Sequence, residues 1–431
     1  MSASHPIALL RRGSGSIAQT FPLTREMDAT RQISLTAAAA GFLFSFRAGL
    51  VMISARSLNC GTEPGVIAGA LAEILLLLAA TLQAFGPASR PVAWIFRLPC
   101  VRWVMVFFAF SCCSLAWSGT VSRPTSLMYW GAMVADVVIV LLFLRGQAVV
   151  DVAHSMMKGY VVAGVGLAGL AWLIPTASDL RLGDLEYFNT NQIANVCAMG
   201  VFMAQFLSSR KDGRWRVSML FLTLTLVRSL SKATLIAFVL SQGVMLIQNK
   251  SMTRSRKAAL AVAVLALGLV FGGLFESYYN VYTTSGNQAE TLTGRTGIWI
   301  YSLKTGLEQP WVGNGFDSMW KVAPPFGPEM FEARHAENEV LQQFFAYGLA
   351  GVAMLAGIYG TLYKSIRGLP RNSTRVVLNG LLLFILIRGL AEAEPFDLLL
   401  PLWSITLICS YLGQLTPSLK HNLNQQHRSA S

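Results

Sequence analysis

Long apolar runs separated by short polar segments dominate this chain. Each run holds about twenty mostly apolar residues, the length of helix that crosses the hydrocarbon core of a bilayer. Because that core contains no water, such runs must be helices whose backbone groups pair within the segment. The pattern predicts about twelve spans, at roughly 33–54, 66–85, 101–117, 126–144, 157–175, 189–208, 215–230, 231–248, 258–275, 338–362, 375–391 and 396–414.

The predicted fold class is therefore all-α, a polytopic integral membrane protein. One large polar segment interrupts the series of spans. The predicted organisation is a cytoplasmic tail, a bundle of nine spans, a large loop, a bundle of three spans and a second tail, at 1–32, 33–275, 276–337, 338–414 and 415–431.

The distribution of positive charge predicts the orientation of the bundle. The chain has a formal charge of +13, and 54% of its residues are hydrophobic. With both termini in the cytoplasm, the inner tails and loops hold about 23 of the 34 lysines and arginines, as the positive-inside rule requires. The charge is thus a topology signal, with anionic lipid as a secondary contact, and it does not indicate nucleic acid. The loop 276–337 then faces the periplasm of a Gram-negative cell.

The cysteines and acidic residues do not indicate a disulfide framework or a metal site. Four of the six cysteines fall in apolar runs, and the sequence contains no Cys-x-x-Cys motif or Cys/His cluster. We expect small packing residues at these positions, no metal and no cofactor.

The polar stretch 291–351 carries most of the titratable side chains on the predicted outer side. Trp299–Leu307 is predicted to form a short amphipathic helix lying on the membrane, and the prolines of 324–328 exclude a continuous helix there. The acidic residues Asp317, Glu329 and Glu332 are expected to be solvated. Large loops rich in such residues are common sites of function.

Ionisable or amide side chains gather at several places on or near this outer side. Each has a structural alternative: an amide can cap a helix, and a charge can form an ion pair with a neighbour. The candidates are Asn191, Arg228, Lys232, Arg295, His335, Glu337, Asn338, Arg388 and Glu392. Inside the predicted spans, Arg47 interrupts the first, and Glu73 and Asp136 are further ionisable residues.

Outward-facing cations beside a membrane are suited to binding a lipid pyrophosphate. Arginine offers a planar fork to phosphate oxygens, and lysine offers a point charge. Such cations would stabilise the charge that develops on a departing pyrophosphate. A neighbouring Glu or His could accept the proton of an attacking sugar hydroxyl.

At these residues the sequence resembles the O-antigen ligase/polymerase superfamily of bacterial membrane glycosyltransferases. The resemblance covers roughly 185–395 and consists of five short motifs in the family's order. They are NTNQIA, RSLSKATLIAFVL, GRTGIWIYSLKTGLEQPWVGNGF, HAENEVLQQFFAYGLAG and LIRGLAEAEPF. No single motif is specific, whereas the ordered set is.

The resemblance implies an inverting glycosyltransferase of GT-C-like architecture in the bacterial inner membrane. Its donor would be an undecaprenyl-pyrophosphate-linked glycan, its acceptor a glycan hydroxyl, and it would need neither metal nor nucleotide sugar. By the same resemblance Lys232 and Arg295 would bind the pyrophosphate, joined by Arg228 and Arg388, while Asn191, Asn338 and Glu392 would support the site.

The chain departs from the family pattern at the expected base. Aligned on Asn338, Leu341 and Gln342, the family's proposed catalytic histidine falls on Glu337. Either Glu337 replaces it, or His335 reaches in from two residues away. We favour Glu337 as the base and His335 as the residue that orients it.

Three functions are compatible with these residues. The first is a polymerase of lipid-linked repeat units for an exopolysaccharide or O-antigen, with a chain-length regulator or copolymerase as a candidate partner. Lys232, where many relatives look to carry arginine, favours it over the second, a ligase that transfers finished glycan to lipid A-core or protein. The third is a polysaccharide exporter or flippase, which would show repeat symmetry and charges across the bilayer centre.

Overall fold

The computed structural model describes the chain over residues 34–86, 89–173, 181–183, 189–208, 213–249, 253–255, 257, 258, 262, 272, 273, 276, 292–326 and 330–415. Within these residues the fold is all-helical, and the one β-type pairing is an isolated bridge between Phe326 and Phe331. The predicted tails, and most of the predicted span 258–275, lie outside the described residues.

Helices occupy the positions of the other eleven predicted spans. They are α2 (Leu35–Met52, continued by the π-helical turn Ile53–Ser57), α3 (Glu63–Ala84), α4 (Pro99–Ser114), α5 (Arg123–Gly146), α6 (Val149–Leu173), α7 (Thr190–Ser208), α8 (Trp215–Ser229), α9 (Lys232–Gln248), α13 (Glu339–Arg367), α14 (Ser373–Arg388) and the unlabelled helix Leu402–Leu415. Five of the described helices are long and apolar enough to cross a membrane: α2 together with its π-helical turn, α3, α5, α6 and α13. Three further apolar helices are shorter: α4, α9 and Leu402–Leu415.

Local sequence explains where several helices begin. The side chains of Ser34, Ser122, Asn338 and Asn372 accept hydrogen bonds from backbone N–H groups in the first turns of α2, α5, α13 and α14. Prolines at the start of α3, α4 and α5 occupy the turn in which a missing N–H costs nothing.

Small residues let the central helices approach closely. A Cβ at Gly41 of α2 would lie 2.0 Å from the Met156 carbonyl oxygen of α6, and one at Gly159 would lie 1.9 Å from the Ala38 carbonyl oxygen. This close backbone packing is typical of helices within a bilayer, where small residues form the interface. α3 leaves Leu71, Leu75 and Leu82 exposed, as a lipid-facing surface requires.

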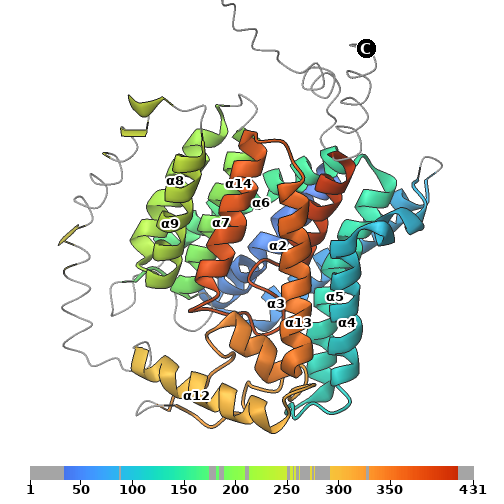
Figure 1. Cartoon of the computed structure of the whole chain (residues 1–431), viewed down its shortest axis with the longest axis vertical. Helices are drawn as coiled ribbons and strands as arrows, with labels where there is room; N and C mark the ends of the chain where they lie inside the picture. Colours follow the sequence, from blue (N-terminus) through green and yellow to red (C-terminus); the bar gives the residue numbers. More distant parts are fainter. Residues whose placement is uncertain are drawn as a thin grey trace, which may run out of the picture.

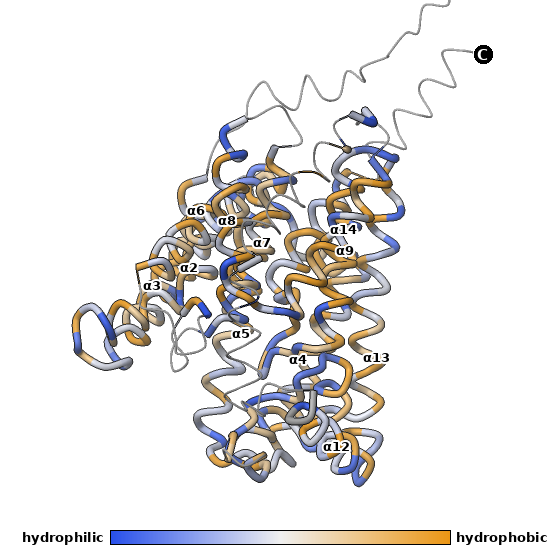
Figure 2. The backbone as a smooth tube through the Cα atoms, turned by 90° about the vertical axis from the view of Figure 1, so that its left-hand side faces the viewer, coloured by the Kyte–Doolittle hydropathy of each residue, from blue (hydrophilic) through white to orange (hydrophobic). Residues whose placement is uncertain are grey.

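The helices stand roughly side by side, and α12 (Leu292–Glu308) lies across one end of them (Figure 1). Hydrophobic positions run along the helices, and hydrophilic positions gather towards the two ends (Figure 2). The chain is thus a multi-pass membrane protein. α12 confirms that the polar segment contains a helix, but the helix begins seven residues earlier than Trp299 and so includes Arg295.

The polar segment has a small core of its own. Ile298 of α12 packs with Met319, Ala333, Ala336 and Phe345, all at most 2% exposed. This core holds α12 against the beginning of α13, and thereby positions the residues before α13. The described parts of this segment, 292–326 and 330–337, are therefore packed together.

The ionisable residues inside the spans form an ion-pair cluster. Arg47 of α2 pairs with Glu73 of α3 at 3.1 Å, and both of its terminal nitrogens donate to the Asp136 carboxylate of α5. Charges within a bilayer are expected to pair in this way. Glu73 and Asp136 are therefore explained by ion pairing with Arg47, which was the structural alternative to a functional role for these residues.

Candidate active site

Arg295 of α12 is the hub of a polar cluster at the α12 end of the bundle. Its Nη2 lies 3.1 Å from Oε1 of Glu392 and 3.4 Å from Oε2 of Glu337, and its Nη1 donates to the Ala391 carbonyl oxygen at 2.7 Å. The Arg295 side chain is 19% exposed and Glu392 4% exposed. One guanidinium therefore joins the segment before α13 to the segment after α14.

The backbone at Glu337 is held in an unusual conformation. Its φ of 51° lies in the left-handed region, which costs a non-glycine residue roughly 1–2 kcal/mol. Three contacts hold it there: Trp299 Nε1 donates to the Glu337 carbonyl oxygen, the Glu337 N–H donates to His335 Nδ1 at 3.3 Å, and Gln342 accepts from the Ala336 N–H. Strain that the surroundings maintain is common at functional sites, and here it aims the Glu337 carboxylate at Arg295.

His335 is positioned as a neutral ring. Burial lowers the pKa of its imidazole from the ordinary value of 6.5, against the attraction of Glu392 and Glu394. Because Nδ1 accepts the Glu337 N–H, the ring proton of this tautomer is on Nε2. His335 Nδ1 also lies 3.7 Å from Glu337 Oε1. His335 thus contacts both the backbone and the side chain of Glu337, and its role as the residue that orients Glu337 stays a prediction.

Arg388, at the end of α14, is a second buried cation. Its side chain is 2% exposed, its Nε donates to Thr234 Oγ1 at 3.3 Å, and its Nη2 lies 4.0 Å from Oε2 of Glu392. Its Nη1 is buried and has no hydrogen-bond partner among the described residues. Buried donors are normally paired, so this N–H group is available to an anionic ligand.

The break between α8 and α9 connects to the same place. Leu230 takes a left-handed φ of 62° and ends α8. Ser231 then donates its hydroxyl to Asn191 Oδ1 at 2.8 Å, and its Oγ also lies 3.0 Å from Thr234 Oγ1. Thr234 in turn contacts Arg388. Arg228 and Lys232 flank this turn, partly buried and exposed respectively.

The structure thus links six of the nine candidate residues through a chain of contacts. Asn191, Arg388, Glu392, Arg295, Glu337 and His335 are joined directly or through Ser231 and Thr234. Asn338 caps α13 and donates to the Leu390 carbonyl oxygen at 3.0 Å, which ties the two polar segments together.

Three residues near this cluster were not among the sequence candidates. Glu394 is partly buried, and its desolvation raises the pKa of its carboxyl group, against the attraction of Arg388 and His335. Arg181, 5% exposed, reaches Asn191 Oδ1 at 3.4 Å, and Thr234 contacts Arg388. Glu394 lies two residues after Glu392 between mostly apolar residues, and this position in the sequence could have identified it as a further candidate.

Asp317 was expected to be solvated, and this expectation was wrong. Its carboxylate accepts a hydrogen bond from Ser126 at 2.6 Å and one from Thr120 at 3.4 Å. Burial raises the pKa of Asp317, and these hydroxyl groups oppose that shift. Glu332 is exposed as expected, and Glu329 lies outside the described residues.

The stretch 310–315 of the polar segment, which contains Gly313 and Gly315, is hydrogen-bonded to α13 at a break in that helix. α13 is broken at Gly348, whose φ is 62° and ψ is −153°. At the break, the N–H groups of Asn314 and Gly315 donate to the carbonyl oxygens of Phe345 and Ala346, and those of Leu349 and Ala350 donate to Pro310 and Trp311. Gly313 and Gly315 also have positive φ. A Cβ at Gly313 would lie 2.4 Å from the Tyr347 backbone nitrogen of α13, and one at Gly315 would lie 2.7 Å from the Ser114 carbonyl oxygen of α4.

The arrangement provides cations, a carboxylate and a neutral imidazole, which suit anion binding and proton transfer. Among the residues that the structure describes, no three His, Cys, Asp or Glu side chains are grouped as a metal site would require.

Comparisons with known proteins show which family and which relatives this chain is similar to. Residues 217–356 match the family model described as O-antigen ligase. The predicted resemblance to the O-antigen ligase superfamily is confirmed. The chain is 29% identical over 142 residues to the O-antigen ligase of Pseudomonas aeruginosa, covering 33% of each chain. It is 22% identical over 325 residues to the exopolysaccharide production protein ExoQ of Rhizobium meliloti, covering 68% of this chain and 72% of that one.

The family segment contains Lys232, Arg295, His335 and Glu337, whereas Arg388 and Glu392 follow it. The match to this family indicates a glycosyltransferase-like enzyme. The match to the Pseudomonas aeruginosa ligase spans a third of that protein.

Proposed function

We propose that this protein is a membrane glycosyltransferase that polymerises oligosaccharide repeat units carried on undecaprenyl pyrophosphate. The observation that carries the proposal is the meeting of Arg295, Glu337 and Glu392, which come from three separate parts of the chain. The likeness to ExoQ over 68% of the chain favours exopolysaccharide as the product.

The donor pyrophosphate would bind the cations of the cluster. Arg388 offers its buried Nη1, Lys232 is exposed at the start of α9, and Arg295 would exchange part of its pairing with the carboxylates for phosphate oxygens. Fixed cations in a partly dry site stabilise the negative charge that grows on the leaving pyrophosphate.

Glu337 would be the general base. An acceptor hydroxyl oxygen attacks C1 of the donor sugar, the bond from C1 to the pyrophosphate oxygen breaks, and the hydroxyl proton passes to the Glu337 carboxylate. The pyrophosphate leaves with the bonding electrons, so direct displacement inverts C1. His335 and Trp299 hold the Glu337 backbone in position. The proposed topology places this site on the periplasmic face of the inner membrane, with both termini inside.

The test is transfer in vitro by the purified full-length protein. A lipid-linked repeat unit is supplied as both donor and acceptor, and products are separated by size. The proposal expects a ladder of lipid-linked polymers, which Arg295→Ala abolishes and Lys304→Ala, on the exposed face of α12, preserves.

The alternative function is a ligase, and the same assay separates it. A single transfer to added lipid A-core, with no ladder, would replace the polymerase assignment while keeping the donor chemistry. Movement of the lipid-linked unit across vesicles without any bond formation would instead indicate an exporter or flippase. Either outcome overturns the polymerase proposal.

A further inference from the structure

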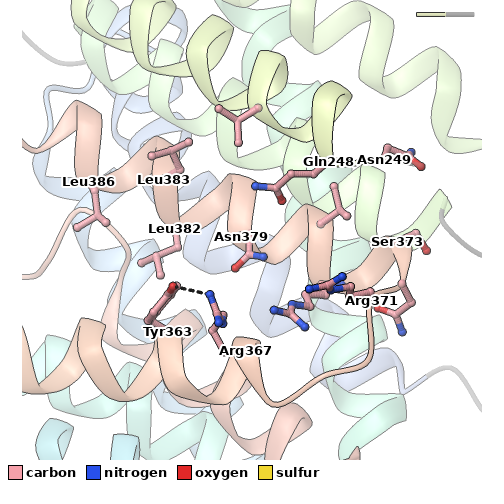
Figure 3. A pocket seen from close by; sticks show the side chains of 14 residues that line it. Gln248, Asn249, Tyr363, Arg367, Arg371, Ser373, Asn379, Leu382, Leu383 and Leu386 are labelled. Atoms are coloured by element: carbon pink, nitrogen blue, oxygen red, sulfur yellow. Dashed lines mark hydrogen bonds between the residues drawn. The ribbon is translucent and has the colours of Figure 1, made fainter. Parts of the chain in front are cut away.

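A pocket of about 570 Å³ lies between α9, α13 and α14 (Figure 3), and it begins at the end of α14 that is remote from α12 (Figure 1). It extends along α14 from Ser373 to Leu386. The Arg295 cluster does not line it. The predicted topology assigns the adjoining loop 363–375 to the cytoplasmic face.

Three arginines line the half of this pocket that is away from Leu386: Arg371 at its end, in the connection between the helices, Arg375 on α14, and Arg367 of α13 further in, beside Tyr363 (Figure 3). Arg367 donates to the Tyr363 hydroxyl at 3.2 Å, and Arg375 donates to the Leu369 carbonyl oxygen at 3.0 Å. Across the described part of the chain, none of the three forms an ion pair with a carboxylate. The end of the pocket is therefore strongly positive.

The other end of the pocket is apolar. Leu382, Leu383 and Leu386 of α14 and Val244 of α9 line it, while Gln248 and Asn379 lie between the leucines and the arginines. Figure 3 shows Arg371 at one end, Leu386 at the far end, and Asn379 and Arg367 between them, with Arg367 beside Tyr363. The lining thus changes from cationic through polar to aliphatic along the helix axis.

We infer that this pocket binds an anionic glycerophospholipid of the membrane leaflet opposite the candidate active site. The phosphate would lie among Arg367, Arg371 and Arg375, the glycerol esters beside Gln248 and Asn379, and the acyl chains along the leucines. Anionic headgroups are attracted to clustered arginines at a membrane surface, and the apolar end supplies a surface that a free anion would not use. The inference is independent of the glycosyltransferase proposal.

The test measures binding of phosphatidylglycerol to the delipidated full-length protein by native mass spectrometry. Phosphatidylcholine and inorganic phosphate are the comparison ligands. Phosphatidylglycerol is expected to bind most tightly. Arg371→Gln is expected to weaken it about fivefold, since a cation near the surface contributes about that factor, and Arg371→Gln/Arg375→Gln about 25-fold.

Two further variants separate the pocket from general charge. Arg102→Gln removes one exposed positive charge from α4, outside the pocket, and is expected to leave binding unchanged. Asn379→Phe keeps the three arginines but fills the middle of the pocket, and is expected to weaken lipid binding while leaving phosphate binding unaffected.

Three results would overturn the inference. The first is equal phosphatidylglycerol affinity in the wild-type protein and the double variant. The second is phosphate binding as tight as that of the lipid, which would define a small-anion site. The third is efficient disulfide crosslinking, in a background without native cysteines, between Leu383→Cys and cysteines placed in 258–275, which would show that the chain itself fills the pocket.

Discussion

Arg295 and Glu392 form an ion pair, with Nη2 3.1 Å from Oε1, although 97 positions separate them in the chain. The pair brings α12 to the segment that follows α14. It also places the cation beside Glu337, so that one guanidinium contacts two carboxylates. A ligand phosphate would compete with carboxylates that already hold the guanidinium in place.

Replacing Arg295 should affect catalysis more than folding. Arg295→Lys keeps a charge but loses the planar fork, and we expect a 10²- to 10³-fold lower rate of polymer formation, the scale on which a transition-state donor acts. The rate is measured on protein normalised for membrane insertion. Lys304→Arg, on the same helix and exposed, is the matched control, and equal losses in both variants would contradict the role of Arg295.

The assignment of the base predicts a difference between Glu337 and His335. Glu337→Gln keeps the shape but removes the proton acceptor, so the rate should fall by roughly 10²- to 10⁴-fold. His335→Asn should cost less, because its role is to hold the Glu337 backbone. If Glu337→Gln retains full activity and His335→Asn has none, then His335 is the base.

The partly buried imidazole of His335 predicts a dependence of stability on pH. The pKa of His335 is lower in the folded protein than its ordinary value of 6.5, so the unfolded chain takes up the proton first. Its contribution to stability is present above pH 6.5 and is lost as the pH falls through the folded-state pKa. The unfolding temperature of the wild-type protein should therefore drop more steeply below pH 6.5 than that of His335→Gln. Parallel curves for the two proteins would contradict this.

Glycine is required at the break in α13. Gly348→Ala combines a positive φ with a Cβ 2.5 Å from the Trp311 backbone, and we expect destabilisation on the order of 3 kcal/mol. The measurement is thermal unfolding in detergent. Gly360→Ala on the same helix has nothing within 4 Å of the added Cβ and should be neutral or slightly stabilising. A neutral Gly348→Ala would show that the break is not required.

The Arg47 cluster predicts a strong effect of removing one partner only. Arg47→Met leaves the Asp136 carboxylate buried without its cation, and should reduce the yield of folded protein sharply. Arg47→Met/Asp136→Leu removes both ends of the pair and should recover much of that yield. Equal yields of the two variants, measured by fluorescence-detected size exclusion, would contradict the structural role of the pair.

Apolar run length predicted most of the fold, because crossing a bilayer imposes a length and a helical backbone on each segment. The Arg228–Lys232 turn was visible for the same reason: its polar residues interrupt an apolar run, and the chain breaks there at Leu230. The twelve-span topology and its orientation stay predictions.

Contacts between distant segments could not be predicted in the same way. Asp317 was misjudged because its partners, Ser126 and Thr120, are nearly two hundred residues away and give no local signal. Glu394 and Arg181 were missed for a related reason, since burial of a charge depends on which helices surround it. Arg295 and Glu337 could be named as candidates because their motifs are local and ordered, and their roles stay predictions.

The docking of 310–315 on the α13 break has a consequence for substrate traffic. Four main-chain hydrogen bonds fasten this stretch to the helix, and swinging it outward would expose all four donors and acceptors at once. We therefore expect 310–315 to stay fixed on α13. Under the proposed function, a glycan product would therefore leave the site without a hinged movement of 310–315 away from α13.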